Sequence, residues 1–223
     1  MLDSNLSMIM KSSLVLITFI VVLLSPPNIG HLVAASSQAT HTVIATTSTQ
    51  TSTTTQITSS ITSVTIRVFF IDVGQGDSIF IDTPGDDVLI DGGPRTEGSK
   101  VVQFLVDLGV NRLDYVIATH PHSDHIGGLI TLFQSSIEIG NVLWNGESRQ
   151  TATYEEWHSL AAQHSMVKTA RGQNYTLANG VWMLVLNPTQ PLEFTETNDN
   201  SVVVKVQVGK TGFMLTGDCE QQC

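Results

Sequence analysis

Three histidines and one aspartate lie within six consecutive positions, in the segment ATHPHSDHIGG at residues 118–128. His120 and His122 are two residues apart in a segment predicted to be extended, so their imidazole rings can point the same way. Asp124 and His125 follow in a turn that leads into a helix. Because the backbone changes direction over so short a segment, these four donors suit two adjacent metal ions better than one. Imidazoles with a carboxylate favour zinc, manganese or iron over calcium.

The segments on either side of this cluster predict where it lies. The apolar run LDYVIAT (113–119) is typical of an interior strand and leads directly into His120. The segment IGGLITLFQSS (126–136) is predicted to be a helix. Gly127 and Gly128 have no Cβ, so the start of this helix can pack closely against the site. The pattern therefore predicts a metal centre at the end of a buried strand.

The rest of the chain after residue 64 alternates strand patterns with helix patterns. Turn sequences separate the first three strands, which predicts an antiparallel meander. The alternation predicts a layered α/β or α+β domain in which helices cover sheets and loops at one edge carry the function. Strands are predicted at 65–72, 78–82, 87–93, 139–144, 180–188 and 201–218, and helices at 99–109 and 153–165.

The first 63 residues differ in composition from the rest of the chain. Residues 1–35 contain an apolar run from Leu14 to Leu24, shorter than the roughly 20 residues that a spanning helix needs, followed by small residues. We predict a signal peptide there, with a retained membrane anchor as the alternative. Residues 36–63 are rich in Ser and Thr and almost uncharged, which predicts a disordered linker, with a β-rich repeat as the alternative. The expected protein is exported, secreted or membrane-anchored through this segment, with one folded domain at 64–223.

Composition and net charge limit which molecules this chain is expected to bind. Hydrophobic residues make up 41% of the chain, which excludes disorder throughout. Lys and Arg number 10 against 20 Asp and Glu, for a net charge of −10. Such a surface disfavours nonspecific wrapping of nucleic acid. A site for a small molecule, or for short or single-stranded nucleic acid, remains compatible with this charge.

Three motifs in unbroken order resemble those of one protein family. THPHSDHIGG resembles the signature of the metallo-β-lactamase fold superfamily. FIDVGQGDSIFIDTPGDDVLIDGG (70–93), and NDNSVVVKV with LTGD at 198–206 and 215–218, resemble the hydrolase domain of competence-type DNA-uptake (ComEC-like) proteins. The resemblance runs from about residue 64 to the end of the chain. It implies an αββα sandwich of two β-sheets packed face to face, with helices outside and the site at a sheet edge.

The resemblance also implies a set of ligands and a reaction. His120 and His122 would bind a first divalent metal ion, Asp124 and His125 a second, and Asp218 would bridge both. Zinc is the expected metal, with manganese or iron as alternatives. A hydroxide held between the metals would be the nucleophile, with Asp124 as the catalytic residue that orients it. The ComEC-like branch implies phosphodiester hydrolysis; hydrolysis of a lactone, thioester or β-lactam carbonyl, or a noncatalytic surface domain, are the alternatives.

Three further aspartates are candidates for supporting roles. Asp77 and Asp91 end strands of the predicted meander and could hydrogen-bond the ligand histidines, or could be solvated turn residues. Asp199, in the NDN motif, could be a metal ligand, a partner of one, or part of an Asx turn that opens a strand. His158 and His164 lie on a predicted helix, where we expect them at the surface.

The end of the chain departs from the pattern of the resembled branch. That branch continues past the bridging aspartate, through a helix and a strand, to a motif that bears a further histidine. Here the sequence stops at Cys223, five residues after Asp218. We therefore expect a domain that lacks its C-terminal part and one ligand of the second metal. Cys219 and Cys223 could form a disulfide or remain free thiols.

Overall fold

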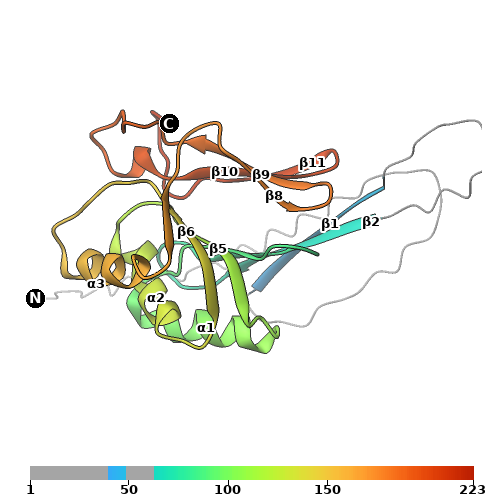
Figure 1. Ribbon diagram of the computed structural model, residues 1–223, viewed down its shortest axis with the longest axis horizontal. Helices are drawn as coiled ribbons and strands as arrows, with labels where there is room; N and C mark the ends of the chain where they lie inside the picture. The colour runs from blue at the N-terminus through green and yellow to red at the C-terminus, as the bar shows by residue number, and fades with distance from the viewer. Residues whose placement is uncertain (1–39, 49–62) are drawn as a thin grey trace, which may run out of the picture. The chain divides into compact units, whose positions relative to one another are not determined.

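The computed structural model describes residues 40–48 and 63–223 (Figure 1). The chain divides into two units, residues 1–37 and residues 38–223, and the first lies outside the described residues. The expected signal peptide or anchor at 1–35 and most of the expected linker at 36–63 also lie outside them. In the described part of the chain, every helix is too short or too polar to cross a membrane.

The larger of two sheets contains seven strands, which follow one another in chain order. Strands β1 to β4 pair antiparallel, and β4 to β7 pair parallel. The antiparallel part confirms the predicted meander. The strands are β1 Thr40–Ser48, β2 Ser63–Ile71, β3 Ile79–Asp82, β4 Val88–Ile90, β5 Arg112–Ala118, β6 Glu138–Trp144 and β7 Ser165–Lys168.

The smaller sheet is antiparallel, with the order β11-β10-β9-β8, and it packs on one face of the larger sheet (Figure 1). Three α-helices cover the other face of the larger sheet. The smaller sheet consists of β8 Asn174–Ala178, β9 Val181–Asn187, β10 Val203–Val208 and β11 Thr211–Leu215. The helices are α1 Gly98–Asp107, α2 Ser123–Phe133 and α3 Ala152–Ala161, with short 3-10 turns η1 Arg95–Glu97 and η2 Asn198–Asn200.

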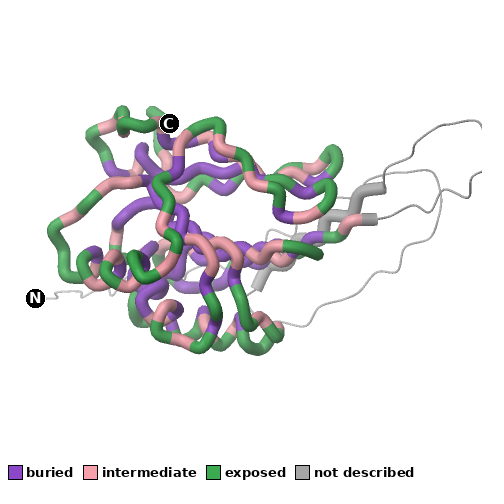
Figure 2. Tube along the Cα trace, in the orientation of Figure 1, coloured by how far each residue is buried: buried purple, intermediate pink, exposed green. Residues whose placement is uncertain are grey.

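Two hydrophobic cores hold these layers together, and strand β4 shows how one strand serves both. Successive side chains of a strand point to opposite faces of its sheet. Leu89 therefore packs in the core beneath the helices, whereas Val88 and Ile90 pack in the core between the two sheets. All three are at most 2% exposed, which explains the continuous apolar run in the sequence. Figure 2 shows the buried positions concentrated between the layers.

The architecture confirms the predicted sandwich of two packed sheets with flanking helices. Among the described residues, the helices flank only the larger sheet. The outer face of the smaller sheet carries exposed apolar side chains, including Trp182 at 44% and Met214 at 61% exposure.

Three strands differ from the sequence predictions. Residues 40–48, expected in the linker, form β1 and pair with β2 from Thr40–Ile71 to Ser48–Ser63. Their Thr, Val and Ile content suits a strand, and β2 offers a free edge. Residues 165–168 form β7, although the predicted helix extended to residue 165, because α3 ends at Ala161 and the chain returns along β6. Strand β8 was not predicted.

The sheet order brings several loops to one edge. Strands β4, β5 and β6 are parallel neighbours, so their carboxyl ends lie together. Asp91 directly follows β4, and the segment Thr119–His125 follows β5. In open parallel sheets, ligands bind outside the carboxyl ends of the strands. The sheet therefore places the histidine cluster where a site is expected.

Candidate metal centre

The first two histidines of the cluster face each other at the end of β5. Their ring centroids are 4.6 Å apart, and His120 Nε2 lies 3.0 Å from His122 Nδ1. His120 is only 1% exposed, whereas His122 is partly exposed and caps the start of α2 in extended conformation. The alternation of an extended segment points both rings the same way, as the spacing predicts.

Asp91 orients the ring of His125 directly and the ring of His120 through Thr119. His125 Nδ1 lies 2.8 Å from Asp91 Oδ2, and the Thr119 hydroxyl donates a 2.6 Å hydrogen bond to the same oxygen. The Thr119 backbone N–H donates to Asp91 Oδ1 at 2.8 Å. Because the Thr119 hydroxyl proton is used on Asp91, its oxygen accepts from His120 Nδ1, 3.0 Å away. Both rings therefore carry a proton on Nδ1, which leaves Nε2 as the ligand atom.

Asp218 lies close to these two Nε2 atoms, in the turn that follows β11. Its carboxylate oxygens lie 3.3 Å from His125 Nε2 and 3.9 Å from His120 Nε2. His125 Nε2 is buried and makes no hydrogen bond within the described part of the chain. His120, His125 and Asp218 each offer one ligand atom within 4.8 Å of the others. A buried nitrogen without a partner, beside a second nitrogen and a carboxylate, fits a divalent metal ion such as zinc.

Burial and neighbouring charge shift the pKa values of these groups in opposite directions. Burial, followed by the nearby rings of His125 and His122 and the charge of Arg149, lowers the pKa of His120 to about 2. Burial alone would also lower the pKa of His125, but its hydrogen bond to Asp91 and the Asp91 charge raise it to about 9. A metal ion that binds His125 therefore displaces a proton, so metal affinity rises with pH.

The helix that carries His125 packs closely on the loop that carries Asp91. A Cβ at Gly128 would overlap the carbonyl oxygen of Gly92, and Gly128 N donates to Gly93 O at 2.9 Å. Gly92 N in turn donates to His125 O at 2.9 Å. The glycines thus allow the close approach predicted from the sequence, and this approach brings Asp91 to hydrogen-bond distance of the His125 ring.

The remaining predicted residues lie at different distances from this centre. Asp77 comes from the β2–β3 loop and forms a second potential ligand group with Asp91 and His125, all within 4.8 Å. Burial, then the charge of Asp91, raises the pKa of Asp77. The Asp124 carboxylate accepts a 2.9 Å hydrogen bond from Gln75 Nε2. Among the described residues, neither ligand group includes Asp124, so its role as a ligand stays a prediction.

Asp199 has a different set of partners. Its Oδ1 accepts hydrogen bonds from the backbone N–H groups of Glu220 at 3.1 Å and Gln222 at 3.4 Å. It therefore anchors the loop that follows Asp218, in which Cys219 and Cys223 form a disulfide with their Cα atoms 6.1 Å apart. This contact gives Asp199 an indirect part in placing Asp218.

Sequence reasoning missed three residues at the site. Thr119 links Asp91 to His120, and Ser201 Oγ lies 3.3 Å from His120 Nδ1. Thr119 could have been found from the sequence, because it is a hydroxyl residue directly before the cluster, at the end of a buried strand. Arg149 places Nη2 3.3 Å from His122 Nε2. Arg149 lies in the loop after β6, and the sequence carries no motif that marks it.

Comparison with known proteins finds similar sequences and structures. The family model described as Metallo-beta-lactamase superfamily matches residues 71–139, which include the histidine cluster. The part of the chain that carries the candidate site therefore matches this superfamily. Among solved structures, it is similar to a metallo-beta-lactamase with a HARLDQ motif from Cronobacter sakazakii, with a TM-score of 0.47, 18% identity, and coverage of 67% of this chain and 58% of that one.

Two curated relatives agree with the branch inferred from the sequence. ComE operon protein 3 of Bacillus subtilis is 27% identical over 174 residues, which is 70% of this chain and 22% of that protein. Recombination protein 2 of Haemophilus influenzae is 25% identical over 166 residues, 70% of this chain and 18% of that protein. The chain thus spans about a fifth of the length of these relatives.

Proposed function

We propose that this chain is a metal-dependent hydrolase of phosphodiester bonds. One observation carries the proposal: two buried imidazoles, each held at Nδ1 by the protein, converge through Nε2 on the Asp218 carboxylate. Such preset donors are what a metallohydrolase needs, because ligands that are already oriented do not have to be ordered on binding.

Divalent metal ions bound here would supply a Lewis acid for developing negative charge and would lower the pKa of water to near neutrality. His120, His125 and Asp218 would hold them, with His122 facing His120 from the partly exposed side. Asp124 Oδ2, held by the Gln75 amide, would accept and return the proton of the attacking water. Asp91 would keep the two buried rings in the ligand tautomer throughout.

The phosphodiester substrate is supported by similarity and by charge. One relative is named Recombination protein 2, and recombination acts on nucleic acid, whose backbone consists of phosphodiesters. The net charge of −10 disfavours long polyanions, so we propose small phosphodiesters or short single-stranded nucleic acid as substrates. The composition of residues 1–35 supports an exported chain, secreted or anchored through that segment.

His122, the partly exposed histidine of the cluster, gives the sharpest test of this function. We expect zinc-loaded wild-type chain to cleave bis-p-nitrophenyl phosphate, and His122→Ala to lose at least about 100-fold in kcat/KM. His158→Ala, on α3 beside Trp144 and Trp157, is the matched control and should keep full activity. Bound metal is measured by elemental mass spectrometry alongside.

The same samples separate the alternatives. Equal turnover by His122→Ala and wild type would contradict a metallohydrolase. Cleavage of a lactone or a β-lactam, without cleavage of the phosphodiester, would point instead to a carbonyl hydrolase. A folded chain that binds no metal and cleaves none of these substrates would indicate a noncatalytic domain.

A further inference from the structure

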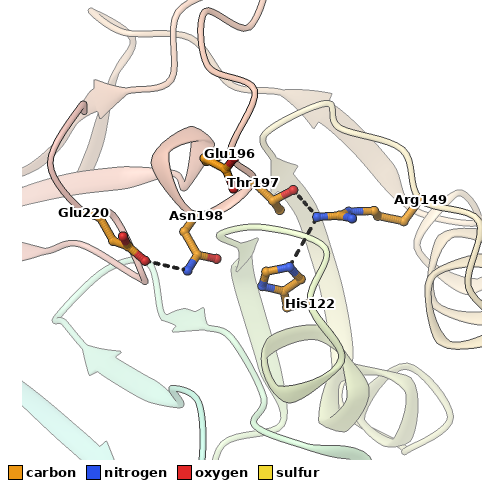
Figure 3. Close-up of a pocket in the computed structure, with 6 residues that line it drawn as sticks. All are labelled: His122, Arg149, Glu196, Thr197, Asn198 and Glu220. Atoms are coloured by element: carbon orange, nitrogen blue, oxygen red, sulfur yellow. Dashed lines mark hydrogen bonds between the residues drawn. The ribbon is translucent and has the colours of Figure 1, made fainter.

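An open pocket lies directly beside His122, on the solvent side of the candidate metal centre. Its empty volume is about 340 Å³. Figure 3 shows that its walls come from the loop after β6, the loop that contains η2, and the segment after Asp218. Among the described residues, it is lined by His122, Arg149, Glu196, Thr197, Asn198 and Glu220.

Arg149 is the one permanently cationic side chain in this lining. Its Nη2 donates to the Thr197 hydroxyl and lies 3.3 Å from His122 Nε2 (Figure 3). Its Nε lies 3.4 Å from Glu147 Oε1, and Thr197 Oγ1 donates to the same oxygen at 2.6 Å. Glu147 and the buried Thr197 thus hold the guanidinium at the pocket wall. An arginine held in this way loses less conformational entropy when it binds an anion.

The polar groups of this pocket are incompletely paired. Asn198 Oδ1 is buried and makes no hydrogen bond within the described part of the chain, whereas Arg149 Nε has only its 3.4 Å ion-pair contact with Glu147. Asn198 Nδ2 donates to Glu220 Oε1 at 3.1 Å, on the opposite wall from Arg149. Buried polar atoms in native structures are nearly always paired, and the unpaired Asn198 oxygen needs a donor. The groups of this pocket that can bind an anion are therefore the N–H groups of the Arg149 guanidinium.

The contact between Arg149 and His122 also depends on which ring nitrogen carries the proton. In the structure His122 Nδ1 faces His120 Nε2, and His122 Nε2 faces Arg149. If Nδ1 is a metal ligand, the neutral ring must carry its proton on Nε2, which then faces an N–H of Arg149. Two donors do not bond, so that N–H of Arg149 becomes available to another acceptor.

We propose that Arg149 is the specificity-determining residue of this site, and that it binds the single negative charge of a small phosphodiester. This inference rests on the proposed function. A guanidinium binds two non-bridging phosphate oxygens with parallel hydrogen bonds. Glu196 and Glu220 are exposed on the same pocket and add two negative charges. They repel further phosphates, so the pocket selects a substrate with one negative charge over a long polyanion.

The test compares matched ligands that differ in charge. Dimethyl phosphate carries one negative charge, and trimethyl phosphate is a neutral molecule of similar shape. Binding of each is measured by NMR titration of the zinc-loaded full chain. We expect Arg149→Gln to weaken dimethyl phosphate by about 10- to 100-fold and to leave trimethyl phosphate unchanged. Lys210→Gln, in the β10–β11 turn, removes the same charge elsewhere and should match wild type.

Kinetics give a second readout on the same variants. Arg149→Gln should lower kcat/KM for bis-p-nitrophenyl phosphate by about 10- to 100-fold and change kcat/KM for neutral p-nitrophenyl acetate by less than about threefold. Arg149→Lys should retain part of the phosphodiester activity, because lysine keeps the charge without the paired hydrogen bonds. The double variant Glu196→Gln/Glu220→Gln should raise activity on a short oligonucleotide relative to bis-p-nitrophenyl phosphate.

The outcomes separate this inference from the proposed function. Equal binding of dimethyl phosphate by wild type and Arg149→Gln would overturn the inference, whatever the chain hydrolyses. A parallel loss of bound zinc and of both activities in Arg149→Gln would also overturn it, since it would assign Arg149 a structural role. If wild type cleaves no phosphodiester but binds dimethyl phosphate through Arg149, the proposed function fails and the anion site stands.

Discussion

Replacing Asp91 by asparagine should disturb the candidate metal centre without disturbing the shape of the fold. Asparagine has nearly the same volume, and it tolerates the positive φ of 56° at this position. Asp91 is fully buried, and its carboxylate accepts from the Thr119 N–H, the Thr119 hydroxyl and the His125 ring. The amide of asparagine must place a donor against at least one of them.

The two orientations of that amide have different costs. With its NH₂ at the Oδ1 position, the buried Thr119 N–H loses its acceptor, which destabilises the fold by about 1–3 kcal/mol. With its NH₂ at the Oδ2 position, the proton of His125 must move to Nε2, and the Thr119 hydroxyl turns toward His120 Nδ1. Both ligand nitrogens then carry protons. Loss of such a supporting hydrogen bond lowers metal affinity by about 10- to 100-fold, equivalent to about 1.4–2.8 kcal/mol.

Two measurements decide between these outcomes. Zinc affinity is measured by competition with a chromophoric chelator at about pH 9.5, above the raised pKa of His125, so that proton competition is weak. Thermal unfolding in excess chelator gives the stability of the metal-free chain. Asp107→Asn is the control, since Asp107 is exposed on α1 and accepts only from Gln103. An Asp91→Asn chain that matched wild type in both measurements would refute the proposed proton arrangement.

Thr119 offers a graded version of the same test. Thr119→Val keeps the volume but removes the hydroxyl that links Asp91 to His120, whereas Thr119→Ser keeps that hydroxyl. We expect the valine variant to bind zinc about tenfold more weakly and the serine variant to stay within about threefold of wild type. Equal affinities for the two variants would show that Ser201, or no hydroxyl at all, orients His120.

Three further perturbations test the scaffold. Burial and the charges of Asp82 and Asp114 outweigh the opposing effects of the Thr83 N–H and Arg67 and raise the pKa of Asp87 to about 6. The folded state therefore binds this proton more tightly than the unfolded chain does, so the free energy of unfolding should fall by about 1–2 kcal/mol between about pH 4 and pH 6. Asp87→Asn should abolish this fall, as measured by urea titrations. Gly128→Ala forces a Cβ into the Gly92 carbonyl and should cost about 2–4 kcal/mol in the same assay. Asp199→Ala should weaken zinc binding about tenfold, by freeing the loop after Asp218, while Asp199→Asn keeps an acceptor and most of the affinity.

The sequence determined those features that depend on neighbours along the chain. Apolar periodicity located nearly all of the helices and strands between residues 63 and 223, since alternation and helical spacing reflect one buried face. The spacing of His120, His122 and His125 at a strand end predicted a metal centre, because local backbone geometry alone brings the first two rings together. The resemblance added Asp218, which lies far along the chain. The structure places its carboxylate beside His120 and His125.

Only the tertiary structure decided how these donors are held. Asp91 is 34 residues from His125, and it reaches the ring because β4 and β5 are parallel neighbours and glycines let α2 pack on the loop after β4. Arg149 faces His122 because β6 extends the same parallel sheet, so that its following loop lies at the same edge. Which strands become neighbours depends on the packing of the whole domain, and local residue patterns do not record it. The candidate metal ligands are therefore visible in the sequence, whereas their supporting hydrogen bonds and their charged neighbour become visible only in the fold.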